Sequence, residues 1–309
     1  MSNLGIKVEN LEKIYSDSVH ALKGVSFAIS KPGLYGIIGP NGAGKTTLLK
    51  LISGLLIPTN GKVFINDQYV KYGSLLPKNT IGFLPENAGL YDKLSARDFL
   101  HIMAGLHGLA GEEKRQRVRE VVKFVGINFS PGKYVKNLST GQRRLLLLAS
   151  VLLHDPPILI LDESLNGLDP IHRHEISELM QELSNDKIVL FSSHILADIW
   201  RLCERVLVLN DGRLTIDDTP ENILLKMSEN TYYISISKNV EKALKILEKQ
   251  NEITNIQKSG DKILFTATSL KAANQAIDSL LEEIEVLAFG PNVADLDELF
   301  RRMVKGFGS

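Results

Sequence analysis

The chain has 309 residues, enough for two domains, and its 36 basic residues balance 36 acidic ones. Nothing in this balance indicates a basic surface for nucleic acid, so we expect no nucleic-acid partner. A single cysteine, Cys203, excludes an internal disulfide and fits a reducing compartment. The longest mostly apolar run, residues 145–153, would span roughly 14 Å as a helix against about 30 Å of bilayer hydrocarbon. Any work at a membrane therefore needs a partner chain.

The first part of the chain predicts short strands around a glycine-rich loop. The strands are expected at residues 6–8, 25–29, 34–38, 62–65 and 81–84. A polar loop over residues 13–17 carries one aromatic side chain, Tyr15. The run that follows the glycines, residues 47–53, contains no breaker and predicts a helix.

From Ser95 onward the pattern changes from strand to helix. Apolar residues recur at helical spacing up to Leu106, and residues 112–125 predict a second, highly charged helix. A third helix is expected to begin near Arg143. Residues from about 90 to 150 therefore predict a helical insertion between strands.

After this insertion, strands and helices alternate. Strands are expected at 158–161, 187–191, 206–209 and 214–216, with helices at 171–183 and 195–203. The run at 158–161 has no polar alternation, which is typical of a strand buried on both faces of a parallel sheet.

The tail, residues 222–309, has its own pattern. Strands are expected at 232–236, 252–256, 263–267 and 285–289, helices at 240–247 and 270–281, and a last helix at 293–303. The order β-α-β-β-α-β is that of the ferredoxin-like split unit. The alternative is an irregular extension wrapped on the first domain.

Residues 39–47 read G-P-N-G-A-G-K-T-T, the full spacing of a phosphate-binding loop. A strand before it and a helix after it would place backbone N–H groups around the phosphates of a nucleotide. Lys45 would supply a point charge and Thr46 a hydroxyl for Mg²⁺. The alternative is a chance glycine-rich turn. The candidate ATP-binding residues of this loop are Gly39, Pro40, Asn41, Gly42, Ala43, Gly44, Lys45, Thr46 and Thr47.

Polar side chains follow two of the later strands. Asp162 closes a buried strand, where a Mg²⁺ partner would compensate its charge; the alternative is a buried carboxylate that caps a loop. Glu163 is the candidate general base for an attacking water, and the alternative is a solvent-facing side chain. His194 ends the strand at 187–191 and could donate to a γ-phosphate. His172 and His174 indicate a solvated helix face rather than a metal site.

The phosphate loop, the sequence Leu-Ser-Thr-Gly-Gln at 138–142, the Asp162-Glu163 pair, Asn-Gly-Leu-Asp at 166–169 and His194 stand in a fixed order. This arrangement resembles the nucleotide-binding subunit of ATP-binding cassette (ABC) transporters over residues 1 to about 220. The resemblance implies an α/β cassette, a P-loop NTPase with a mixed sheet core, over residues 1–221. It implies a helical subdomain at about 88–150. The separate pattern of the tail predicts a small ferredoxin-like α+β accessory domain at 222–309.

The resemblance also implies a shared ATP site. Ser139, Gly141 and Gln142 would bind the γ-phosphate held by the phosphate loop of a second ATP-binding subunit, either an identical chain or a paralogue. Ser139 and Gly141 are expected just before a helix, and Ser139 would also cap it. Tyr15 matches the aromatic residue that stacks on adenine; the alternative is an ordinary exposed tyrosine.

Four residues at three sites depart from the family pattern. Glu86 stands where the family usually has Gln, which touches Mg²⁺ and the attacking water. Its carboxylate can still bind Mg²⁺ but adds charge beside the phosphates, so either hydrolysis is tuned or the metal contact moves to a neighbour such as Asn87. Thr140 replaces a common Gly, and Ser164-Leu165 replaces the commoner Pro-Thr. Asp169 is retained, so a contact across the dimer is expected.

The sequence therefore predicts an ATPase subunit that uses ATP and Mg²⁺ to power an ABC transporter. The tail, and residues 295–300 within it, resemble the exporter branch with a C-terminal accessory domain. The expected partner is a polytopic membrane permease, which would hold this cytoplasmic chain at the cytoplasmic face of the membrane. The alternative is a soluble ABC ATPase acting on ribosomes, DNA or iron–sulfur assembly. Ribosome-type members carry two cassettes in one chain, whereas this sequence has one. DNA-repair types insert long coiled coils or zinc modules, and the sequence shows neither.

Overall fold

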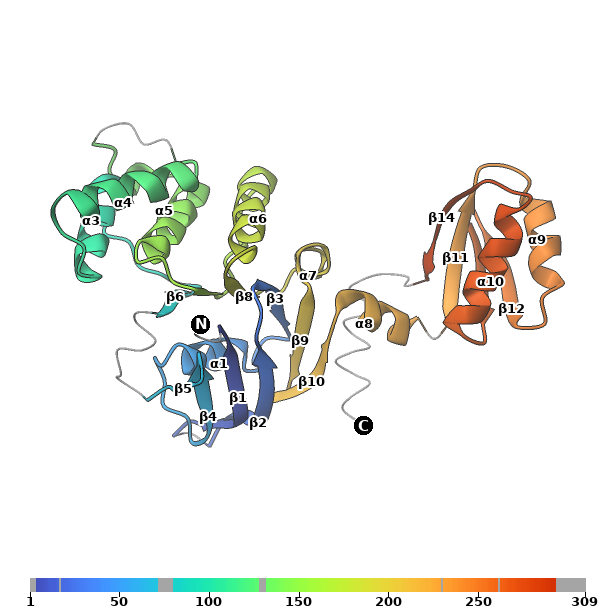
Figure 1. Ribbon diagram of the computed structural model, residues 1–309, viewed down its shortest axis with the longest axis horizontal. Helices are drawn as coiled ribbons and strands as arrows, with labels where there is room; N and C mark the ends of the chain where they lie inside the picture. Colours follow the sequence, from blue (N-terminus) through green and yellow to red (C-terminus); the bar gives the residue numbers. More distant parts are fainter. Residues whose placement is uncertain are drawn as a thin grey trace. The chain divides into compact units, whose positions relative to one another are not determined.

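The computed structural model describes residues 4–16, 18–71, 80–127, 132–228, 230–260 and 262–292. The chain divides into two units, Met1–Asp217 and Asp218–Ser309 (Figure 1). Within the described ranges, no helix combines the length and apolar character that crossing a membrane requires. The helix expected at 293–303 and the segment 295–300 lie outside the described residues.

A six-stranded sheet forms the centre of the first unit, in the order β10-β9-β3-β8-β7-β6. Five of its strands, from β9 to β6, run parallel. All four residues of β7 are buried, as the unbroken apolar run predicts. The strands are β3 (Gly33–Ile38), β6 (Ile81–Leu84), β7 (Ile158–Leu161), β8 (Ile188–Ser192), β9 (Arg205–Asn210) and β10 (Arg213–Asp218).

A second, antiparallel sheet has the order β2-β1-β4-β5. It comprises β1 (Ile6–Ile14), β2 (His20–Ile29), β4 (Asn60–Ile65) and β5 (Gln68–Tyr69). The polar loop expected from residue 13 begins only after Ile14. The reason is that β1 pairs with β2 up to Ile14, which lies opposite His20. Burial of the side chains of Leu11 and Leu22 stabilises this pairing.

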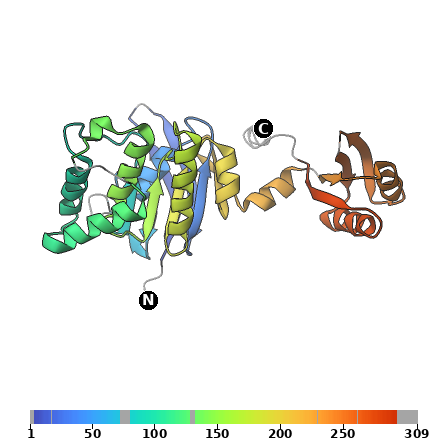
Figure 2. The same ribbon diagram turned by 90° about the horizontal axis from the view of Figure 1, so that it is seen from above.

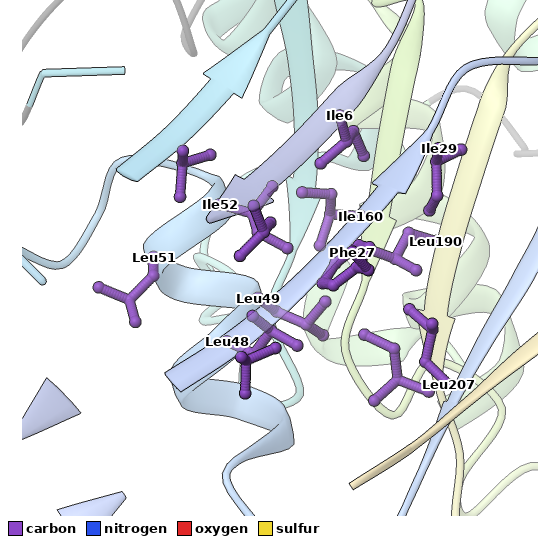
Figure 3. Packing of buried hydrophobic residues seen from close by; sticks show 14 of the residues in the cluster. Ile6, Phe27, Ile29, Leu48, Leu49, Leu51, Ile52, Ile160, Leu190 and Leu207 are labelled. Carbon is purple, nitrogen blue, oxygen red and sulfur yellow. The ribbon is translucent and has the colours of Figure 1, made fainter. Parts of the chain in front are cut away.

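The core of this unit lies between the two sheets, around α1 (Lys45–Ile52). Leu48, Leu49 and Ile52 of α1 pack with side chains of both sheets (Figure 3). The helix that begins at the phosphate loop is thus fixed by hydrophobic packing on both sides, which holds the loop in place.

Helices cover the rest of the first unit. α3 (Ala96–Leu106), α4 (Gly111–Phe124) and α5 (Thr140–Leu152) form the predicted helical insertion, with a 3₁₀ turn at Val135–Asn137. α5 contacts α6 (Pro170–Ser184), and α6 packs on β3 and β8 (Figure 2). The short α7 (Leu196–Leu202) packs on β3. The insertion is therefore joined to the central sheet through α5.

In the described part of the second unit, two helices, α9 and α10, pack on one antiparallel sheet, and a third, α8, precedes them. Its strand order is β12-β13-β11-β14, and the apolar sides of α9 and α10 form its core with residues such as Tyr232 and Phe265. The helix α8 was not predicted. The elements are α8 (Pro220–Met227), β11 (Thr231–Ile236), α9 (Val240–Glu248), β12 (Ile253–Ser259), β13 (Lys262–Ala267), α10 (Leu270–Leu281) and β14 (Val286–Pro291).

Candidate active site

The phosphate loop connects β3 to α1. Gly42 and Gly44 have φ of 82° and 101°, a left-handed conformation that favours glycine. A Cβ at Gly44 would lie 2.5 Å from the carbonyl oxygen of Ala21, so the loop leaves no space for a side chain there. Gly44 is the N-cap of α1 and makes no side-chain cap. The first N–H groups of α1 are thus available to bind phosphate oxygens.

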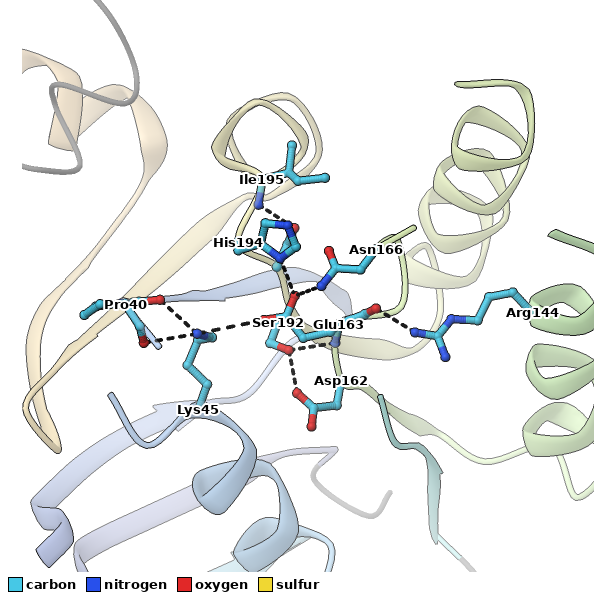
Figure 4. A network of polar contacts seen from close by, with 11 residues as sticks. Pro40, Lys45, Arg144, Asp162, Glu163, Asn166, Ser192, His194 and Ile195 are labelled. Atoms are coloured by element: carbon cyan, nitrogen blue, oxygen red, sulfur yellow. Dashed lines mark hydrogen bonds and ion pairs between the residues drawn. The ribbon is translucent and has the colours of Figure 1, made fainter. Parts of the chain in front are cut away.

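Lys45 lies folded back over the loop. Its Nζ donates to the carbonyl oxygens of Gly39 at 2.8 Å and Pro40 at 3.3 Å, and it lies 3.8 Å from Oε1 of Glu163 (Figure 4). The residue is only 7% exposed. The charge of a buried ammonium group is costly unless it is compensated, and here carbonyl oxygens and a carboxylate share that role.

Ser192, at the end of β8, joins the two acidic residues that follow β7. Its hydroxyl donates to Oδ1 of Asp162 at 2.7 Å and accepts from the N–H of Glu163 at 2.8 Å. Ser192 was not among the predicted site residues. Its contribution depends on β7 and β8 being parallel neighbours, which local sequence does not reveal.

The other carboxylate oxygen of Asp162, Oδ2, is buried and has no hydrogen-bond partner among the described residues. An unpartnered buried carboxylate oxygen is costly, and a divalent cation would remove that cost. In the part of the chain that the structure describes, no group of three or more His, Cys, Asp or Glu residues could hold a metal by itself. A single carboxylate, that of Asp162, together with the phosphates of a bound nucleotide fits Mg²⁺, which is usually bound by one or two carboxylates and substrate phosphates.

Glu163 has a φ of 48°, unusual for a residue with a side chain. Holding a residue in this conformation costs about 1–3 kcal/mol. Its Oε2 accepts a hydrogen bond from Nδ2 of Asn166 at 2.5 Å and lies 3.2 Å from Nδ1 of His194. The candidate base is thus oriented by neighbours on two loops (Figure 4). Asn166 was noted within the Asn-Gly-Leu-Asp sequence, but its contact with Glu163 was not foreseen.

Residues 41–47 of the loop line one cavity of about 490 Å³; of the predicted site residues, Gly39, Pro40 and Asp162 are not part of its lining. It brings the loop together with four side chains predicted from elsewhere in the sequence, Tyr15, Glu86, Glu163 and His194. The hydroxyl of Tyr15 lies 3.2 Å from Oγ1 of Thr47. The lining residues are Tyr15, Val19, Ala21, Asn41, Gly42, Ala43, Gly44, Lys45, Thr46, Thr47, Glu86, Glu163, Asn166 and His194.

Ser139, Gly141 and Gln142 do not line this cavity; they lie at the start of α5. Ser139 caps the helix, accepting from the N–H of Gln142 at 3.2 Å, while the side-chain oxygen of Gln142 accepts from the N–H of Ser139 at 3.3 Å. This reciprocal cap starts the helix at Thr140. The expectation that Gly141 precedes the helix is therefore wrong, because Gly141 lies in its first turn.

His172 contacts the start of α5, so its interpretation as part of a solvated helix face was wrong. Its Nδ1 lies 2.6 Å from Oδ2 of Asp169, the residue that caps α6. Its ring covers Gly141 so closely that a Cβ there would lie 2.2 Å away. The cap of α6 turns this ring toward the neighbouring helix. His174 is exposed and pairs with Glu178 at 3.3 Å, as expected for a solvated position.

Comparisons with known proteins agree with this geometry. The sequence profile of the family described as "ABC transporter" matches residues 22–166. The uncharacterised ABC transporter ATP-binding protein YxlF of Bacillus subtilis is 29% identical over 300 residues, which cover 97% of this chain and 99% of that protein. The bacitracin transport ATP-binding protein BcrA of Bacillus licheniformis is 30% identical, and the match covers 97% of each chain.

A solved structure gives the same result. The post-hydrolysis dimer of the ATP-binding cassette MJ0796, bound to ADP and Pi, is 26% identical and has a TM-score of 0.64. The match covers 70% of this chain and 98% of that one. Its agreement is thus with the cassette rather than with the whole chain. The chain belongs to the ATP-binding proteins of ABC transporters, and it is the ATPase subunit of such a transporter.

Proposed function

We propose that this ATPase hydrolyses MgATP in the cavity between the phosphate loop and the end of β7, with Glu163 as the general base. The observation that carries the proposal is the polar network in which Glu163 contacts Lys45, Asn166 and His194 at one cavity wall. Thr46 and Asp162 would hold Mg²⁺, with Glu86 near them. The ion would neutralise charge on the β- and γ-phosphates.

In this mechanism the N–H groups of the loop and the ammonium of Lys45 bind the phosphate oxygens. Glu163 accepts a proton from a water in line with the γ-phosphate, the new P–O bond forms, and the bond to the leaving β-phosphate oxygen breaks. His194 donates a hydrogen bond to the γ-phosphate. Ser192 and Asn166 keep the base in place, because they fix its N–H and its carboxylate.

Glu86 adds a negative charge beside the phosphates where the family usually has a neutral Gln. Its side chain is exposed and lines the cavity. We propose that this carboxylate tunes hydrolysis. If it does not contact the metal, the neighbouring Asn87 takes that contact.

The residues Ser139, Gly141 and Gln142, which we call the signature residues, support a site shared by two chains; α5, which they begin, is the signature helix. Ser139 stands at a helix N-terminus outside the chain's own cavity, and helix N-termini bind anions. The MJ0796 cassette, which resembles this chain, is a dimer bound to ADP and Pi. We propose that Ser139, Gly141 and Gln142 contact ATP held by a partner subunit, either an identical chain or a paralogue. Tyr15 would stack on the adenine.

Mixing two inactive variants tests the shared site. Lys45→Ala inactivates the phosphate loop of one chain, and Ser139→Arg inactivates the signature residues of the other. In a mixed dimer both defects fall in the same site, so the second site keeps an intact loop and intact signature residues. For random pairing we expect about a quarter of the parental ATP turnover, with each variant alone inactive. The control mixes Lys45→Ala with the double variant Lys45→Ala/Ser139→Arg, which leaves no intact loop. An equally inactive test mixture, in which mixed dimers demonstrably form, would refute the shared site.

We propose that the transporter is an exporter. The relatives include a bacitracin transport protein, a linearmycin resistance protein at 29% identity and a Nod factor export protein at 29% identity. A polytopic permease would hold the chain at the cytoplasmic face of the membrane. We assign the first unit, Met1–Asp217, to the cassette and the second, Asp218–Ser309, to an accessory domain, because the boundary expected after residue 221 would fall within α8. The strand order β12-β13-β11-β14, all antiparallel, supports a ferredoxin-like accessory domain.

The segment after Glu86 is the proposed contact with the permease. Tyr91 is 71% exposed, Leu90 is half-buried, and Ile102 is exposed on α3. Phe99 is buried, so it belongs to the core of the insertion and not to the contact surface. Exposed apolar and aromatic side chains of this kind fit a partner helix.

A double change in this segment tests the contact. Leu90→Asp with Tyr91→Ala is expected to leave ATP affinity unchanged, since surface changes usually cost within about 0.5 kcal/mol. It should break co-purification with the permease from detergent and abolish transport. The matched control is Leu55→Asp, another exposed apolar position of the cassette. Undiminished co-purification and transport in the double variant would move the contact elsewhere.

A further inference from the structure

Arg144 lies on α5, two residues after the last signature residue, and its side chain contacts the backbone of the active site. Nη2 donates to the carbonyl oxygen of Glu163 at 2.6 Å and Nε to that of Ser164 at 2.9 Å. Nη1 donates to the carbonyl oxygen of Glu86 at 3.2 Å. One guanidinium thus holds the segments that follow β7 and β6, and Figure 4 shows its contact with Glu163.

The peptide that carries Glu163 needs such support. Its φ is 48°, so its conformation is unfavourable unless the surroundings hold it. The hydroxyl of Ser192 fixes the N–H of this residue, and Arg144 fixes its carbonyl oxygen. Both ends of the residue are therefore tied, one by β8 and the other by α5.

The hydrogen-bonding geometry of Arg144, rather than its charge alone, makes these contacts. Within the described ranges, no carboxylate lies at ion-pair distance from its guanidinium. Burial lowers the pKa of Arg144, and the charges of Glu86, Asp162 and Glu163 oppose that shift. The donors of a guanidinium spread along a rigid planar fork and so reach three carbonyl oxygens on two separate segments, whereas the three N–H groups of a lysine ammonium all lie on one nitrogen.

We infer that Arg144 is a positioning residue: it holds the backbone on either side of the bond between Glu163 and Ser164, and so links the placement of the base to the signature helix α5. This inference rests on the proposed role of Glu163 as the base. A shift of α5, whose first residues would contact the partner's ATP, is transmitted through Arg144 to the carbonyl of Glu163. Placement of the base then depends on the signature helix of the same chain.

The test compares turnover with nucleotide affinity in the purified full-length chain. For Arg144→Met we expect kcat to fall about 100-fold, because displacement of a catalytic group by about 1 Å can cost that much. The dissociation constant for ATP should stay within about twofold, because the phosphate loop is untouched. Arg144→Lys keeps the charge and loses the fork, so its kcat should also fall, by at least about tenfold.

The control is Arg117→Lys. Arg117, on α4, binds two carbonyl oxygens at the other end of α5, those of Leu152 at 2.8 Å and Leu153 at 3.0 Å. It is the same kind of contact far from the base, and kcat should stay near the parental value. A second measurement adds guanidinium ion to Arg144→Ala: the ion should restore part of kcat without changing ATP affinity.

Three results would overturn the inference. One is a parental kcat in Arg144→Met; another is full activity in Arg144→Lys, which would reduce the role to charge. The third is an equal loss of kcat in Arg117→Lys, which would make the effect one of general stability. Glu163→Gln is measured in parallel. If it keeps its turnover, the proposed base is wrong; if it is inactive while Arg144→Met is fully active, only the role of Arg144 is wrong.

Discussion

Glu163→Gln is expected to lower ATP turnover by about 10²- to 10⁴-fold, the usual contribution of a positioned general base. The amide keeps the shape of the side chain and can still contact Asn166, but it cannot accept the proton of the attacking water. ATP affinity should be retained, since the phosphate loop is intact, and ATP should hold the dimer closed. Steady-state turnover and nucleotide titration, measured on the same preparation, separate the two effects.

The control for this variant is Glu182→Gln, a change of the same kind at an exposed position of α6. It should behave as the parent. Glu163→Gln with more than about a tenth of the parental turnover would remove Glu163 from the role of base.

Lys45→Ala is expected to act on binding rather than on the chemical step alone. The buried ammonium lies above the loop at 2.8 Å from the carbonyl oxygen of Gly39, and its removal takes away the charge-assisted hydrogen bonds to phosphate. Hydrogen bonds to charged groups contribute about 1.5–3 kcal/mol, so ATP should bind roughly 10- to 100-fold more weakly. Calorimetric titration with ATP measures this change.

Lys50→Ala provides the comparison, because Lys50 is an exposed lysine of the same helix. Its ATP affinity should match that of the parent. Equal affinity of Lys45→Ala and the parent would contradict the assignment of residues 39–47 as the phosphate loop.

The phosphate loop could be predicted from the sequence because its chemistry is local. Gly44, Lys45 and Thr46 are neighbours, and a strand and a helix frame them in the chain. Asp162 and Glu163 were predictable for a similar reason, since a fully apolar strand ends directly before them. Both groups consist of residues that are adjacent in the chain, so their spacing in the sequence was enough to predict them.

The supporting contacts could not be predicted in this way. Ser192 reaches Asp162 across neighbouring strands, and Arg144 reaches Glu86 across 58 positions of the chain. Strand order and helix packing create these contacts, and neither can be predicted from a local sequence pattern. His172 was misread because its exposure depends on α5, a separate helix that packs beside α6.

In the second unit, periodicity predicted the order of strands and helices but not their pairing. The short helix α8 was missed, although Thr219 caps it and Pro220 opens it. A proline after a threonine is a common helix start, and this signal at Thr219 and Pro220 was not used in the prediction.

The most direct test of the two-chain ATPase site is a structure of Glu163→Gln trapped with MgATP. We expect two cassettes that enclose two ATP molecules, each bound by the phosphate loop of one chain and by Ser139 of the other. The metal should contact Thr46 and Asp162. An ATP molecule bound within a single chain, with the Ser139 region of every other chain far from its γ-phosphate, would contradict this account.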